Sequence, residues 1–94
     1  MDIFIASRLS NGNGLFPVEL HLDDYSMRLV KPGLTRASEK TIKYKNITSI
    51  EVMSPFIGFS KIIFSMYGLD KLIVEGFERT DAEEIRRLVE IKMR

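Results

Sequence analysis

Residues that reverse the chain direction recur at short intervals through the first three quarters of the sequence, and this spacing limits what the chain can fold into. The turn clusters are Asn11–Gly14, Asp23–Asp24, Pro32–Gly33, Lys45–Asn46, Pro55 with Gly58, Tyr67–Asp70 and Gly76. Each contains Gly, Pro, Asn or Asp, residues that tolerate a positive φ or restrict φ. The intervals favour a succession of short strands joined by tight turns.

The segments between these turns have the two-residue period of half-buried strands. In one of them Val18, Leu20 and Leu22 alternate with Glu19 and His21. Similar segments are Ile3–Ser7, Tyr25–Leu29, Thr41–Lys45, Ser49–Val52, Ile62–Met66 and Leu72–Val74. We therefore expect seven strands in one antiparallel meander.

The C-terminal segment changes to a helical period. Thr80 and Glu83 have the spacing of a capping box at a helix start. Apolar residues then follow at helical spacing: Ala82, Ile85, Leu88 and Val89. We expect ion pairs at i,i+4 spacing, Glu83 with Arg87 and Glu90 with Arg94. The apolar stripe of this helix is expected to cover the open end and the unpaired edges of the curled sheet.

The chain resembles the bacterial PH-like domains, a family with the pleckstrin-homology superfold, over about residues 15–93. The resemblance is carried by Leu20–Leu29, Lys40–Val52, Ile57–Phe64, Glu75–Phe77 and Thr80–Ile85. It implies a single domain over residues 1–94, mainly β with one C-terminal α-helix: a seven-stranded antiparallel PH-like barrel or sandwich capped by the helix. It also implies a binding or interaction scaffold, in a family whose members often self-associate.

Specific recognition of phosphoinositides does not follow from this resemblance. PH domains that hold inositol phosphates gather Lys and Arg around the loop between their first two strands. The corresponding loop here, Leu9–Pro17, contains no cation.

The composition argues against catalysis. The chain has 94 residues, no Cys and one His, which leaves no thiolate site and little room for His-based metal or triad chemistry. The adjacent Asp23 and Asp24 are typical of a turn. We expect no enzyme, no cofactor and no small-molecule substrate. The absence of Cys, of a targeting segment and of a long apolar run favours a cytoplasmic protein.

The net charge of +1 is unevenly distributed, because the middle of the sequence is basic. Residues 28–46 carry a net +5, with only Glu39 opposing the cations Arg28, Lys31, Arg36, Lys40, Lys43 and Lys45. This patch could face an anionic membrane, or it could be the solvated side of a strand, with Lys40 discouraging edge pairing. It lacks the interleaved aromatic residues that stack on bases, which argues against nucleic acid.

A second candidate surface consists of apolar residues left over after the core is assigned. Ile63 and Ile73 are out of phase with the inward-facing residues of their strands, and Phe56, Ile57 and Phe59 crowd a loop. Some of them could lie beneath the C-terminal helix, and the others could form a self-association or partner surface. The leading hypothesis is therefore a small protein-interaction module that forms homo-oligomers. Peripheral binding to anionic lipid through the basic patch is the alternative.

Overall fold

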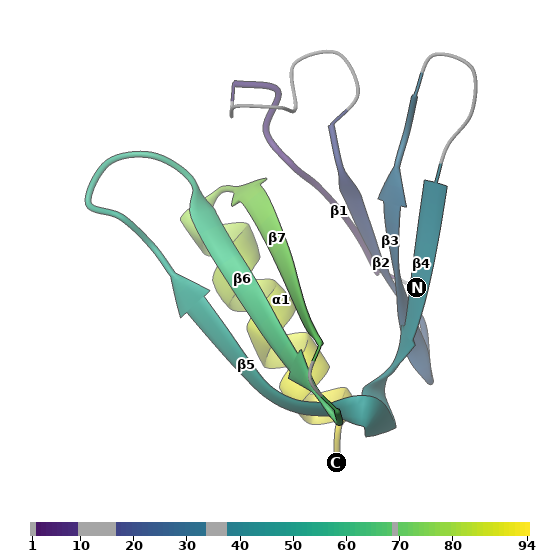
Figure 1. Ribbon diagram of the computed structural model, residues 1–94. Helices are drawn as coiled ribbons and strands as arrows, with labels where there is room; N and C mark the ends of the chain where they lie inside the picture. The colour runs from purple at the N-terminus through teal and green to yellow at the C-terminus, as the bar shows by residue number, and fades with distance from the viewer. Residues whose placement is uncertain (1, 10–16, 34–37, 69) are drawn as a thin grey trace.

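Two antiparallel sheets and one helix make up the computed structural model, which describes residues 2–9, 17–33, 38–68 and 70–94 (Figure 1). The first sheet has the order β1-β2-β3-β4 and the second the order β5-β6-β7. The strands are β1 (Asp2–Ile5), β2 (Glu19–Leu22), β3 (Ser26–Lys31), β4 (Ser38–Lys43), β5 (Ile47–Met53), β6 (Ser60–Met66) and β7 (Lys71–Phe77). The fold is therefore mainly β with a C-terminal helix, α1 (Arg79–Lys92), as the sequence predicts.

The expectation of one continuous meander is wrong, because the chain changes sheets after β4. A short 3-10 helix, η1 (Tyr44–Asn46), turns the chain from β4 into β5, and the two sheets diverge from that corner (Figure 1). On the other side, the amide of Ser7 donates to the carbonyl oxygen of Gly76 at 2.8 Å, which ties the end of β1 to β7. The sheets are not closed into a barrel among the described residues.

Successive side chains of each strand point to opposite faces of the sheet, and this alternation decides which of them enter the core. Leu20 and Leu22 of β2, and Ile62 and Phe64 of β6, are fully buried, while their neighbours on each strand point outward. Both sheets contribute to one buried cluster, together with the helix residues Ala82, Ile85 and Val89. The side chains of β5, β6 and β7 that face away from this cluster form what we call the outer sheet face.

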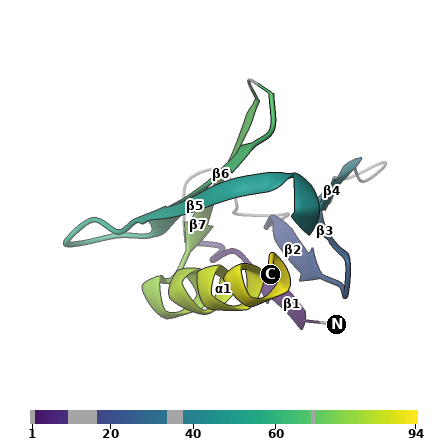
Figure 2. The same cartoon turned by 90° about the horizontal axis from the view of Figure 1, so that it is seen from below.

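The helix packs along the inner face of β5 and β6 rather than only across an open end (Figure 2). The expected capping box is absent. The helix begins at Arg79, Glu78 is the N-cap residue, and Thr80 lies inside the first turn with no side-chain cap bond. Phe77, the last residue of β7, is fully buried, so the core holds the chain there and only Glu78 separates strand from helix.

Candidate functional site

The loop between β5 and β6 carries two adjacent apolar side chains that are strongly exposed. Phe56 is 103% exposed and Ile57 is 86% exposed. Gly58, with φ at +116°, helps the chain reverse. The side chains of Ser54 and Ser60 are hydrogen-bonded at 2.6 Å across the base of the loop. The hairpin projects from the rest of the fold (Figure 2), so the core covers neither apolar side chain.

A shallow apolar pocket of about 440 Å³ lies at the base of this loop. It is lined by Met53, Ser54, Pro55, Phe59 and Lys61. Phe59 is half-buried there, and Met53 is 48% exposed. The loop therefore combines a projecting apolar tip with an apolar recess.

Ile63 and Ile73 lie opposite each other on β6 and β7, on the outer sheet face. Ile63 is half-buried and Ile73 is 52% exposed. The helix cannot cover either residue, because it packs on the opposite face against the side of Ile62 and Phe64. The expectation that the helix covers part of this apolar surplus is thus wrong for these two isoleucines.

The apolar loop and this isoleucine pair are connected across the outer sheet face. Met53 is paired with Lys61, and Glu51 with Ile63, so Met53 is the diagonal neighbour of Ile63. Diagonal neighbours on one face of a sheet are about 7–8 Å apart, within reach of long side chains. Apolar groups therefore extend from the loop tip to β7.

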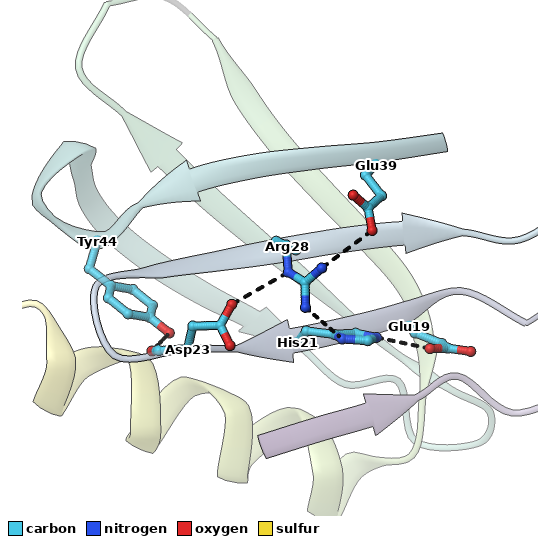
Figure 3. A network of polar contacts seen from close by, with 6 residues as sticks. All are labelled: Glu19, His21, Asp23, Arg28, Glu39 and Tyr44. Atoms are coloured by element: carbon cyan, nitrogen blue, oxygen red, sulfur yellow. Dashed lines mark hydrogen bonds and ion pairs between the residues drawn. The ribbon is translucent and has the colours of Figure 1, made fainter. Parts of the chain in front are cut away.

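The basic residues expected to form one patch are divided between different environments. Arg28 lies on the outward side of β3, within 3.4 Å of carboxylate oxygens of Asp23 and Glu39 (Figure 3). Its Nη2 also lies 3.4 Å from Nδ1 of His21, and the other ring nitrogen of His21 lies 2.9 Å from Glu19. These carboxylates offset the charge of Arg28, so this residue contributes to the sheet surface rather than to a free cationic patch.

Three of the other cations come together. Lys40, Lys43 and Lys45 line an open pocket of about 760 Å³ between β4 and the turn that joins β6 to β7. The remaining lining residues are Thr41, Ile42, Asn46, Met66, Tyr67 and Asp70. Lys31 is exposed at the end of β3 and does not line this pocket. Arg36 lies outside the described residues.

The sequence did not predict that Asn46, Tyr67 and Asp70 would join these lysines. Each lies in a turn cluster, but the turn pattern alone does not show which turns meet in space. The amide of Tyr67 donates to the carbonyl oxygen of Asn46 at 3.0 Å, and this bond holds the two turns together. Lys45 was expected in a strand, but β4 ends at Lys43 and Lys45 lies in η1.

Tyr44 fixes the corner beside this pocket. Its hydroxyl donates to the carbonyl oxygen of Asp23 at 2.6 Å, and its side chain is almost fully buried. Burial, reinforced by the negative charges of Asp23, Asp2 and Asp24, raises the pKa of Tyr44 to about 12. The hydroxyl is therefore a neutral structural donor at physiological pH.

Within the described residues, no group of three or more His, Asp or Glu side chains is arranged to hold a metal ion. The helix of the described chain is too short and too polar to cross a lipid bilayer. Comparisons with protein-family models, with curated proteins and with solved structures find no match to this chain. The argument for function therefore depends on the two surfaces described above.

Proposed function

We propose that this chain is a small, non-enzymatic interaction module with a PH-like arrangement, and that it self-associates through the β5–β6 loop and the outer sheet face. The PH-like assignment is supported by a four-stranded sheet followed by a three-stranded sheet and a C-terminal helix. One observation carries the functional proposal: Phe56 and Ile57 are almost completely exposed at the loop tip, and apolar side chains continue from there to Ile73.

A second copy of the chain suits this surface. The isoleucine pair is flanked by two acidic residues, Glu51 and Glu75, and by two basic residues, Lys61 and Lys71. Lys61 and Glu75 already approach each other to 3.9 Å. Because the charges balance, two copies related by a twofold axis can place unlike charges opposite each other. A strongly charged partner would gain little from such a face.

The available area indicates a weak dimer. Three seven-residue strands, about 4.8 Å apart, cover roughly 350 Å² in projection. A fully exposed Phe adds about 200 Å². The total is below the roughly 800 Å² per partner of a standard stable interface. We therefore expect association that depends on concentration.

Sedimentation velocity over a range of protein concentrations tests this proposal with two matched variants. Ile73 on β7 and Ile91 on the helix are 52% and 50% exposed, so Ile73→Ser and Ile91→Ser remove equivalent apolar groups. Burial of the exposed half of one Ile contributes about 1 kcal/mol, and a twofold dimer contains two copies, so Ile73→Ser should raise the Kd roughly 30-fold. Ile91→Ser should leave it unchanged.

A wild-type protein that stays monomeric at millimolar concentration would refute self-association. Equal weakening by both variants would refute the assigned face. Peripheral binding to anionic membranes has less support, because Arg28 is engaged by Asp23 and Glu39. Salt-sensitive co-sedimentation of the wild-type protein with acidic vesicles, without self-association, would favour that alternative.

A further inference from the structure

The edge of β4 is free of a partner strand among the described residues. In the first sheet, β4 is hydrogen-bonded only to β3. The amide of Tyr44 donates to the carbonyl oxygen of Tyr25 at 3.2 Å, across the same strand pair. Because hydrogen-bonding direction alternates along an antiparallel strand, the backbone groups of Glu39, Thr41 and Lys43 point away from β3. This row of donors and acceptors can accept another strand.

Lysines flank this free edge on both sides of the sheet. Lys40 is opposite Leu29, so it belongs to the inner side of β4, whereas Lys43 is opposite Ser26 and belongs to the outer side. Lys45 follows in η1, and all three line the same open pocket, with Asp70 as the acidic residue among its lining. None of the ion pairs of the described residues involves these lysines.

This charge arrangement selects the strand that can pair with the edge. A second β4 centred on Thr41 would place Glu39 opposite Lys43, but it would leave Lys40 opposite Ile42, without a carboxylate. A neutral strand would leave the lysine charges uncompensated. A strand with carboxylates at the matching positions would form favourable cross-strand pairs on both sides of the sheet.

We propose that the β4 edge binds an extended acidic segment of a partner protein as an added strand. The backbone of Glu39, Thr41 and Lys43 supplies the hydrogen bonds. Acidic side chains lie opposite Lys40 and Lys43, and a small apolar side chain lies opposite Ile42. This site uses the backbone edge of β4 in the first sheet, whereas self-association is proposed through the β5–β6 loop and the outer face of the second sheet.

The register gives a specific probe. Antiparallel to Lys43, Ile42, Thr41 and Lys40, the matching segment is Glu-Val-Thr-Glu. The capped peptide Thr-Glu-Val-Thr-Glu-Thr can be titrated into isotopically labelled full-length protein, with Thr-Gln-Val-Thr-Gln-Thr as the neutral control. We expect amide chemical-shift changes along β4 and around the lysine pocket. We also expect tighter binding of the Glu peptide, with an advantage that falls as salt rises.

Two pairs of variants separate charge from backbone recognition. Lys43→Gln should weaken binding of the Glu peptide about two- to fivefold, whereas Lys31→Gln, the same change outside the pocket, should not. Thr41→Pro removes a backbone N–H that points away from β3 and should abolish binding. Thr41→Val keeps that N–H and should preserve it. Proline is tolerated on edge strands when its nitrogen faces outward.

Absence of shifts on β4 at saturating peptide would overturn the proposal, as would equal affinity for the Glu and Gln peptides. Equal binding by the two Thr41 variants would overturn the added-strand geometry. If Thr41→Pro does not fold, the Lys43 and Lys31 comparison decides. Binding to phosphatidylserine vesicles that requires Lys40 and Lys43, without peptide binding, would assign these lysines to a membrane instead. None of these outcomes depends on whether the protein self-associates.

Discussion

Replacing Tyr44 by Phe removes one oxygen atom from the corner where the two sheets separate. The hydroxyl donates to the carbonyl oxygen of Asp23 at 2.6 Å, so it links η1 to the turn between β2 and β3. The aromatic ring is 2% exposed and belongs to the main buried cluster. Nζ of Lys92, near the end of the helix, lies 6.0 Å from the ring centroid. The Phe variant keeps the ring and this contact, so the substitution isolates the hydrogen bond.

The loss of stability in the Phe variant follows from the hydrogen bond that the carbonyl oxygen of Asp23 no longer accepts. A neutral hydrogen bond contributes about 0.5–1.5 kcal/mol net, and an acceptor left without its partner in a partly buried position adds to that loss. We therefore expect Tyr44→Phe to lower the free energy of unfolding by about 1–2 kcal/mol. For a domain of this size, that corresponds to a decrease in Tm of about 5–10 °C. Tyr44→Ala, which also empties the space filled by the ring, should cost about 3–5 kcal/mol.

The pH dependence gives an independent check. Burial and the nearby aspartates raise the pKa of Tyr44 from 10.0 to about 12 in the folded protein. The unfolded chain binds its phenolic proton less tightly, so this contribution to stability is fully present below pH 10 and is lost as the pH rises from 10 to 12. The Phe variant has no such proton. The stability difference between wild type and variant should therefore shrink above pH 10.

Urea denaturation monitored by circular dichroism, repeated from pH 7 to pH 11.5, measures both effects. Every other ionisable group is present in both proteins, so its effect cancels in the comparison. Equal stability of the two proteins at pH 7 would refute the role of the hydrogen bond. A stability difference that stays constant up to pH 11.5 would refute the burial argument.

Three further substitutions test the core, the backbone and the surface. Phe64→Ala, at a fully buried position of β6, should lower the free energy of unfolding by about 3–5 kcal/mol in urea denaturation; a loss below 1 kcal/mol would contradict its place in the core. Gly76→Ala, at a buried residue with φ at +98°, should cost about 1–3 kcal/mol by thermal denaturation, and an unchanged Tm would contradict the strained backbone. Arg87→Gln, which removes an exposed ion pair with Glu84, should leave the Tm essentially unchanged, and a clear decrease would show that the pair is not merely a surface contact.

Local periodicity was sufficient to predict most strands and the helix, because each depends on which side chains can be buried. Leu20 and Leu22 enter the core on a two-residue period, as expected. The same rule fails at the corner. Tyr44 follows Ile42 in phase and is buried, but the chain around it has already turned into a 3-10 helix. Side-chain burial alone therefore does not distinguish a strand end from a buried turn.

Which charged residues lie close together in the fold could not be predicted from any local sequence pattern. Arg28 belongs to the same run of cations as Lys40 and Lys43, but antiparallel pairing brings Glu39 of the next strand close to it. The lysines meet Asp70 only because η1 folds β4 back toward the turn after β6. Composition revealed the excess of charge, and strand register decided which cations remained free of acidic partners.

The two proposed surfaces differ in their charge, and one uses a sheet face whereas the other uses a strand edge. A balanced set of charges around Ile63 and Ile73 permits identical chains to meet, whereas the three lysines beside β4 favour a strand that carries carboxylates. These lysines make the edge selective for a carboxylate-bearing strand. Because the two surfaces belong to different sheets, a dimer formed through the outer sheet face would leave the backbone edge of each β4 without a partner strand. Such a dimer would bind a partner with two acidic segments more tightly than a partner with one, through the higher effective concentration of the second site.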